Sequence, residues 1–317
     1  MFGENTIKAK LIPIFFKSGN EDEFNNQLNT LRNLLVEDAE ILEPIILSST
    51  IPGADAVIFP QLLGDAFKQI DDLKKIKLPF LIATSEFGTV NMWDWEIITY
   101  MKSEGIKIFS PYTINLTKKI CRSLGLKREM KKTKFIVFQD NPGDGMQSSI
   151  FKRFYWWEKE CTDLIKKKFG IEIIKNSFKK LGEEAKKISD KETQEVRKKW
   201  NLKSEDVTDD SINSAIKLYI AIKKRIEKDD CIRSAGINCL NESFYSDTTP
   251  CLAWNMLFKE KNIIWGCEAD TLTMLTMYII YNSLDVPVMM SNIYPFLMGQ
   301  AAIKHEKITK FPDVLKP

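Results

Sequence analysis

The chain has 317 residues, 44% of them hydrophobic, which is enough for two domains that each bury a core. The 46 Lys and Arg residues nearly balance the 43 Asp and Glu residues, which argues against nucleic acid or an anionic membrane surface as a partner. Residues 1–10 lack the apolar core of a secretory signal, and no apolar run is long enough to span a membrane, so we expect a cytoplasmic protein.

The six cysteines and the single histidine restrict the kinds of site that the chain can build. The cysteines show no CxxC spacing, and we expect reduced, buried thiols. His305 lies among charged residues, where a surface position is expected. One histidine argues against a His-rich zinc site and against a Ser–His–Asp triad.

Strand-like and helix-like segments alternate through the first part of the chain. Short apolar runs predict strands at 8–16, 42–47, 56–60, 78–83 and 106–109. Helical spacing of apolar residues predicts helices at 21–37, 61–76, 93–103 and 115–124. This alternation is typical of a doubly wound parallel α/β domain, and we place its end at residue 132, within the basic bridge 127–134.

A second alternation follows, and it predicts a second doubly wound domain over 133–317. The strands are expected at 134–139, 171–175, 234–239, 263–267 and 286–290. Helices are expected near 151–164, 211–226 and 269–283. The Lys- and Glu-rich stretch 179–203 is interpreted as solvated helices rather than a nucleic-acid patch. The glycine-containing turn 140–145 is interpreted as a plain strand-to-helix turn in preference to a phosphate cradle.

Polar side chains follow three strands of this second domain. Glu242, Glu268 and Asn292 each come shortly after a strand-like run. The carboxyl ends of parallel strands meet at one edge of a sheet, where ligands bind, so we expect these residues to line a site. Glu268 lies between an apolar strand and an apolar helix, a costly place for a carboxylate unless it is paired or binds a cation. Asp270 is either a catalytic residue or the cap of the following helix.

The first domain offers three further candidates, Gln61, Glu86 and Trp93, as substrate contacts. Glu86 and Gln61 follow predicted strands, which again places them at a carboxyl edge. Trp93 and Trp95 either stack on a sugar ring or seal a domain or subunit contact, and the sequence leaves both interpretations open.

Residues 236–280 resemble the L-fucose isomerase and L-arabinose isomerase superfamily. The resemblance is carried by Cys267-Glu268-Ala269-Asp270 at the end of a strand, by the helix that follows with the residues LTMYI, and by the preceding Pro250-Cys251 helix start. Looser agreement extends to EFGTVNMW at 86–93 and VFQDNPGDGM at 137–146.

The resemblance implies a metal-dependent aldose–ketose isomerase that acts on a free monosaccharide through an enediol. Members carry two doubly wound domains and a β-rich third domain, use Mn²⁺ (Mg²⁺ being the alternative), and form trimers or hexamers with shared active sites. By this resemblance Glu268 is a metal ligand and acid–base residue, and Asn292 stands where the family has a second, carboxylate ligand. No residue here matches the histidine of the third domain, which we expect to be missing or rudimentary after about residue 290.

Two other interpretations remain open at this stage. The absent histidine and Asn292 favour a non-catalytic sugar-binding or regulatory protein that retains the isomerase fold. A periplasmic-type binding protein also has two lobes of alternating strands and helices, but the missing signal sequence argues against it.

Overall fold

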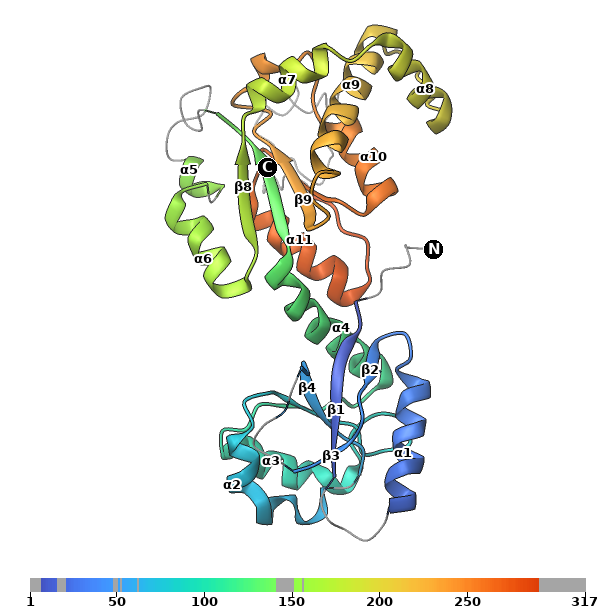
Figure 1. Cartoon of the computed structure of the whole chain (residues 1–317), viewed down its shortest axis with the longest axis vertical. Coiled ribbons are helices and arrows are strands. Elements are labelled where there is room, and N and C mark those ends of the chain that lie inside the picture. Colours follow the sequence, from blue (N-terminus) through green and yellow to red (C-terminus); the bar gives the residue numbers. More distant parts are fainter. Residues whose placement is uncertain are drawn as a thin grey trace, which may run out of the picture.

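The computed structural model describes residues 7–15, 21–47, 51, 53–61, 63–140, 151–155 and 157–290. These residues form two parallel sheets with helices on both faces, and the sheets lie at opposite ends of an elongated molecule (Figure 1). The expected fold class, two doubly wound α/β units, is confirmed.

The first sheet has the strand order β2-β1-β4-β5-β6, with β3 pairing to β1. Its strands are β1 (Ala9–Phe15), β2 (Ala39–Ile41), β3 (Ile45–Ile46), β4 (Ala56–Phe59), β5 (Phe80–Ile82) and β6 (Ile108–Phe109). Its helices are α1 (Glu21–Leu34), η1 (Gly64–Gln69), α2 (Ile70–Lys75), η2 (Met92–Asp94), α3 (Trp95–Ser103), α4 (Ile114–Glu129) and η3 (Met130–Lys132). The strand predicted at 42–47 is therefore wrong in extent, and the helix predicted from residue 61 begins at Gly64 as a 3₁₀ turn.

Strand β1 shows why both faces of this sheet need cover. Ala9 and Leu11 point to the face packed by α1 and α4, whereas Ile12 and Ile14 point to the face packed by α2 and α3. All four side chains are buried. A parallel sheet that is apolar on both sides must carry helices on both sides.

The second sheet has the strand order β10-β9-β7-β8. Its strands are β7 (Lys134–Phe138), β8 (Glu172–Asn176), β9 (Ile232–Ile237) and β10 (Ile264–Cys267). Its helices are α5 (Phe151–Phe154), α6 (Lys159–Phe169), α7 (Phe178–Lys186), α8 (Asp190–Trp200), α9 (Asp209–Ile226), η4 (Ser243–Tyr245), α10 (Cys251–Lys261) and α11 (Thr271–Leu284). Helices α7, α9 and α10 cover one face, and α6, α11 and the end of α4 cover the other.

The strand predicted at 286–290 is wrong. These residues follow α11 without strand pairing, and Val286 and Met289 are exposed. Pro287 has no N–H to donate to a ladder. The backbone N–H of Cys267 in β10 instead meets the Sδ atom of Met290 at 3.3 Å. Among the described residues, β10 is therefore an edge strand.

Within the Lys- and Glu-rich stretch, α8 is largely exposed as expected, whereas α7 packs Leu181 and Ala185 into the core of the second sheet. The start of α8 is held by a capping box in which Ser189 and Glu192 bond each other's backbone N–H groups. Within the described part of the chain, none of the helices combines the length and hydrophobicity that crossing a membrane requires.

Helix α4 contributes to the cores of both sheets. Cys121 and Leu124 pack in the first core, and Leu126 packs in the second. The segment 127–134, expected to be a basic bridge, is mostly the end of this helix and η3. A Cβ atom at Gly125 would lie 2.8 Å from the carbonyl oxygen of Lys8, so glycine permits α4 to approach the start of β1 closely.

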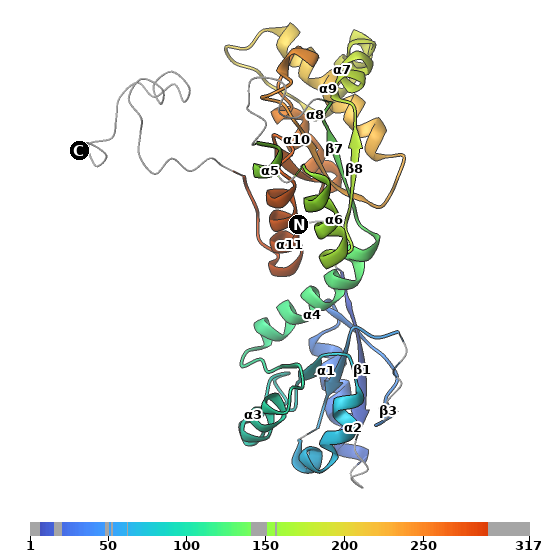
Figure 2. The same ribbon diagram turned by 90° about the vertical axis from the view of Figure 1, so that its left-hand side faces the viewer.

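The two sheets turn their amino edges toward this helix and their carboxyl edges away from each other (Figure 2). Arg122 of α4 ties the units together, because it bonds Asp38 at 2.6 Å and Asp285 at 3.3 Å. Asp38 precedes β2 of the first sheet, whereas Asp285 follows α11 of the second unit. The carboxyl edges of the two sheets, where ligands bind in this fold class, consequently lie at opposite ends of the molecule (Figure 2).

Two leucines of α11 provide a matched test of this packing. Leu275 is 4% exposed in the second core, whereas Leu272 is 39% exposed. We expect Leu275→Ala to lower the free energy of unfolding by about 2–5 kcal/mol and Leu272→Ala to lower it by less than about 1 kcal/mol. Equilibrium urea denaturation checks both values, and equal costs for the two variants would contradict the packing of α11.

Candidate functional site

The carboxyl edge of the second sheet has a topological switch point between β7 and β9. The chain leaves β7 for the neighbouring β8 and then crosses back to β9 on the other side of β7. Phe138 and Ile237 are register partners at the ends of these strands. The next residues, Gln139 and Asn238, therefore emerge side by side at the position where doubly wound sheets bind ligands.

Both of these amide side chains are buried, and both have unpartnered atoms. Gln139 is 7% exposed and Asn238 is fully buried. Within the described residues, neither Oε1 nor Nε2 of Gln139 has a hydrogen-bond partner, and neither does Oδ1 of Asn238. A buried polar atom left in this way costs about 1–3 kcal/mol, so such atoms call for a physical explanation.

Glu242, a predicted substrate contact, joins the ends of β7 and β9. Its buried carboxylate accepts the backbone N–H of Asp140 at 2.9 and 3.0 Å and the side-chain N–H of Asn238 at 3.1 Å. Hydrogen bonds to a carboxylate are strong, so Glu242 holds the two strand ends at a fixed separation. Glu242 thus lies at the expected edge, with its oxygens directed at the protein.

Glu268 lies in an uncommon backbone conformation directly after β10. Glu268 and Ala269 have φ values of 54° and 55°, the left-handed region that costs a non-glycine residue roughly 1–2 kcal/mol. Backbone N–H groups of Ala269 and Asp270 close the turn onto Gly266 and Cys267 at 3.3 and 3.1 Å. Strained turns of this kind persist only where the surrounding structure determines them.

A pair of aromatic residues far away in the sequence supplies that surrounding structure. The indole N–H of Trp157 donates to the carbonyl of Ala269 at 2.8 Å. The phenol of Tyr155 donates to the carboxylate of Glu268. The carbonyl of Tyr155 accepts the N–H and the hydroxyl of Thr271 at 3.2 and 3.1 Å. The turn is therefore clamped on both sides.

Gly236 of β9 places this turn over the end of the neighbouring strand. A Cβ atom at Gly236 would lie 2.8 Å from the Cα atom of Ala269 and 3.0 Å from the Sδ atom of Met274. Only a residue without a side chain permits this approach. The turn that carries Glu268 is thus packed close to the strand that ends at Asn238.

Asp270 has the hydrogen bonds of a helix cap. Its Oδ1 atom accepts the N–H groups of Leu272 and Thr273, each at 3.0 Å, and its Oδ2 atom accepts the Thr273 hydroxyl at 2.7 Å. These contacts match the capping role that the sequence left open for Asp270. Its predicted catalytic role stays a prediction.

Two thiols meet at the same edge, at the ends of β9 and β10. Hydrogen bonding from the Cys267 thiol lowers the pKa of Cys239 to about 7; burial opposes this, and the backbone N–H of Glu268 adds to the lowering. The same thiol–thiol bond, together with burial, raises the pKa of Cys267 above its usual range. The pair of thiols therefore loses its first proton readily and holds its second proton strongly.

Of the two ligands predicted for Mn²⁺ or Mg²⁺, the structure describes only Glu268, whose carboxylate bonds the phenol of Tyr155. Such ions take about six oxygen ligands, several of them carboxylates. No group of three or more His, Cys, Asp or Glu side chains within the described residues is arranged to hold a metal ion. The second predicted ligand, Asn292, lies outside the described residues, so its distance from Glu268 remains untested.

The first-domain candidates lie at the other end of the molecule (Figure 1). Gln61 lines a cavity of about 360 Å³ at the carboxyl edge of the first sheet, together with Gln27 and Thr84. Glu86 lies in the loop after β5 and Trp93 lies in η2, and both side chains are exposed. Within one chain, the structure thus brings Glu242, Glu268 and Asp270 to one edge and Gln61, Glu86 and Trp93 to another.

Asp94 anchors the loop that carries Trp93, and sequence reasoning missed it. Its buried carboxylate accepts the N–H of Leu63 at 3.0 Å and the hydroxyl of Thr84 at 2.6 Å. Burial raises the pKa of Asp94 because it disfavours the charged carboxylate, while these two bonds oppose the rise. The role of Asp94 is to fix the path of this exposed segment.

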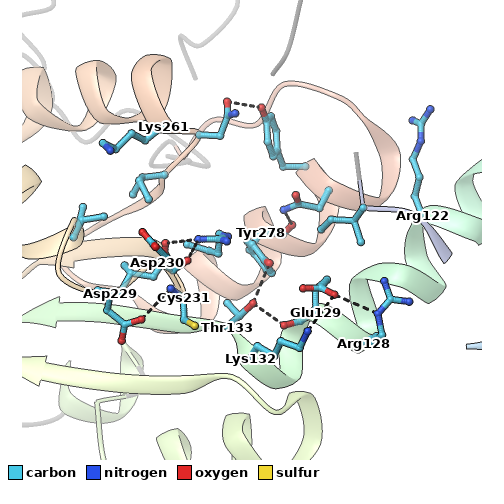
Figure 3. A pocket seen from close by; sticks show the side chains of 18 of the residues that line it. Arg122, Arg128, Glu129, Lys132, Thr133, Asp229, Asp230, Cys231, Lys261 and Tyr278 are labelled. Carbon is cyan, nitrogen blue, oxygen red and sulfur yellow. Dashed lines mark hydrogen bonds and ion pairs between the residues drawn. The ribbon is translucent and has the colours of Figure 1, made fainter. Parts of the chain in front are cut away.

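A larger cavity of about 1060 Å³ lies between the two units, at the amino edge of the second sheet (Figure 3). Its described lining contains six basic and six acidic residues. The basic groups are largely paired: Arg128 bonds Asp55 and Glu129, and Lys261 bonds Glu227 at 2.9 Å. A balanced, internally paired lining selects neither anions nor cations, so this cavity carries less chemistry than the carboxyl edge.

Four residues of this edge do not stand out as site residues in the sequence: Gln139, Asn238, Tyr155 and Trp157. The one usable signal was the aromatic run Phe154-Tyr155-Trp156-Trp157 beside a predicted strand-to-helix connection. Buried tyrosine and tryptophan require partners for their O–H and N–H groups, and here the Glu268 turn provides them.

No protein-family model matches this chain, and no curated protein matches it. The resemblance to the fucose and arabinose isomerases therefore stays a prediction that depends on the residues named above.

Trp157→Phe tests the clamp on the Glu268 turn. The ring is retained but its N–H is lost, which leaves the buried carbonyl of Ala269 unpaired. We expect the free energy of unfolding to fall by about 1–3 kcal/mol. Trp93→Phe, a change at a 72% exposed ring, serves as the control and should have almost no effect. Chemical denaturation measures both, and an unchanged stability of Trp157→Phe would contradict the clamp.

Proposed function

We propose that this protein binds a monosaccharide at the carboxyl edge of its second sheet. The observation that carries the proposal is the pair of buried amides, Gln139 and Asn238, whose unpartnered atoms lie at the switch point between β7 and β9. An amide offers both a donor and an acceptor, which is what the hydroxyl groups of a sugar require.

The energetics of the free protein favour such a ligand. Hydrogen bonds to a sugar would satisfy atoms of Gln139 and Asn238 that are now buried without partners within the described residues. The two amides have already lost their hydration in the free protein, so ligand binding does not add the free-energy cost of removing that water. A ligand without hydroxyls would leave the same atoms unpaired, and this gives the site its selectivity.

Aldose–ketose isomerisation is the second candidate activity, and the contact between Tyr155 and Glu268 favours it. A carboxylate bonded to a phenol places a base and a weak acid together at the ligand edge. Moving a hydrogen between two adjacent sugar carbons needs a base at one carbon and an acid at the other. In this proposal Glu268 takes the proton, and Tyr155 orients the carboxylate.

Gln139→Met separates the binding role of this amide from its cost in stability. Methionine has a similar shape and no polar amide, so we expect the free energy of unfolding to rise by about 1–2 kcal/mol. Monosaccharide affinity should fall at least about tenfold. Calorimetric titration with L-fucose, L-arabinose and other free monosaccharides checks the affinity.

The control is Gln194→Met, at an exposed position of α8. It should leave both stability and affinity unchanged. If the unmodified protein binds none of the monosaccharides, or if Gln139→Met binds them as well as the unmodified protein, the proposed binding role is wrong.

Glu268→Gln tests isomerisation. Glutamine keeps an oxygen that can accept the Tyr155 hydroxyl but cannot take a proton, so we expect the rate to fall by at least about 10²-fold with the fold retained. The assay follows conversion of aldoses to ketoses by NMR, with and without added Mn²⁺. Glu96→Gln, at an exposed position of α3 in the first unit, should keep full activity. Equal rates for Glu268→Gln and the unmodified protein would exclude Glu268 as the base.

A further inference from the structure

Two cysteines from neighbouring strands meet at the carboxyl edge of the second sheet. Cys267 is the last residue of β10, and its register partner in β9 is Ile237. Cys239 follows two residues later, and its N–H bonds back to the carbonyl of Ile237 at 2.8 Å, so the chain turns instead of leaving the strand end. The turn therefore keeps Cys239 beside the end of β10, and the two thiols are close enough for each to shift the pKa of the other.

This pair differs from the other cysteines of the chain. Cys121 is fully buried between α4 and the first sheet, out of reach of a solute. Cys251 is exposed at the start of α10, and it acts on Cys267 only through its charge. Cys239 and Cys267 combine contact with each other and partial exposure, which a small oxidant requires.

We propose that Cys239 and Cys267 form a reversible disulfide on reaction with a peroxide. The sulfur of Cys239 attacks one oxygen of hydrogen peroxide, the O–O bond breaks, and a sulfenic acid and one water are formed. The sulfur of Cys267 then attacks the Cys239 sulfur, the S–O bond breaks, and the hydroxide leaves with the Cys267 proton as a second water. Both cysteines are oxidised, and both peroxide oxygens are reduced.

The strand geometry suits the bond. Paired strands are about 4.8 Å apart, which is the spacing between Cys267 and Ile237, and the turn after Ile237 keeps Cys239 near this strand end. A disulfide joins Cα atoms separated by roughly 4.4–6.8 Å. The bond would tie the end of β9 to the end of β10, directly before the Glu268 turn. The proposal does not depend on sugar binding or isomerisation, because its readout is the covalent link itself.

The experiment treats the reduced, full-length protein with a small molar excess of hydrogen peroxide, blocks the remaining thiols with iodoacetamide, and identifies linked tryptic peptides by mass spectrometry. Cys239 lies in peptide 234–259 and Cys267 lies in peptide 262–304. We expect these two peptides to be linked, with a loss of two hydrogens, and to be released by dithiothreitol.

Cys251 shares peptide 234–259 with Cys239, so two matched variants assign the bond. Cys251→Ser should retain the link, and Cys239→Ser should lose it. The proposal is overturned if the unmodified protein shows no link after peroxide treatment, or if the link persists in Cys239→Ser and disappears in Cys251→Ser. The result for the unmodified protein needs no variant to fold.

Discussion

The packing of α4 between the two cores is the constraint on which the rest of the arrangement depends. Leu124 belongs to the core of the first sheet and Leu126 to that of the second, so one helix fixes the amino edges of both. Gly125 lets this helix approach β1, and Arg122 adds ionic contacts to each unit. Since the amino edges face the shared helix, the carboxyl edges face solvent at the two ends, and each sheet presents its own ligand edge.

The edge of the second sheet carries an unusual concentration of costly features. Two left-handed residues, two buried amides with unpartnered atoms and a buried carboxylate lie around the ends of β7, β9 and β10. Glu242 and the pair Tyr155 and Trp157 hold this edge in place by hydrogen bonds. Folding alone gives no reason to retain several such costs in one place, whereas a ligand that satisfies the amides does.

Much of this architecture could be predicted from the sequence, and the failures have physical causes. The apolar run that becomes β10 and the longer run that becomes α11 predict a parallel edge with Glu268 on it. The run at 286–290 has the same apolar character, but a strand needs a neighbouring strand and backbone N–H donors. Pro287 has no backbone N–H. The clamp from Trp157 acts across more than one hundred residues, and no local pattern encodes such a contact. Whether an amide such as Gln139 finds a partner likewise depends on its neighbours in space.

The thiol pair adjoins the Glu268 turn, because Cys267 directly precedes Glu268 and its carbonyl accepts the N–H of Asp270 at 3.1 Å. This couples the chemistry of the thiols to the geometry of the turn. The backbone N–H of Glu268, a residue with a left-handed φ of 54°, acts on the sulfur of Cys239 and lowers the pKa of that thiol. A sulfur engaged in a disulfide is a poorer acceptor than a thiolate, so oxidation weakens a contact of a turn that already carries backbone strain. The carboxylate that Tyr155 orients is part of that same turn. Oxidation of these two cysteines would therefore reach the candidate base through the backbone of the residue that bears it.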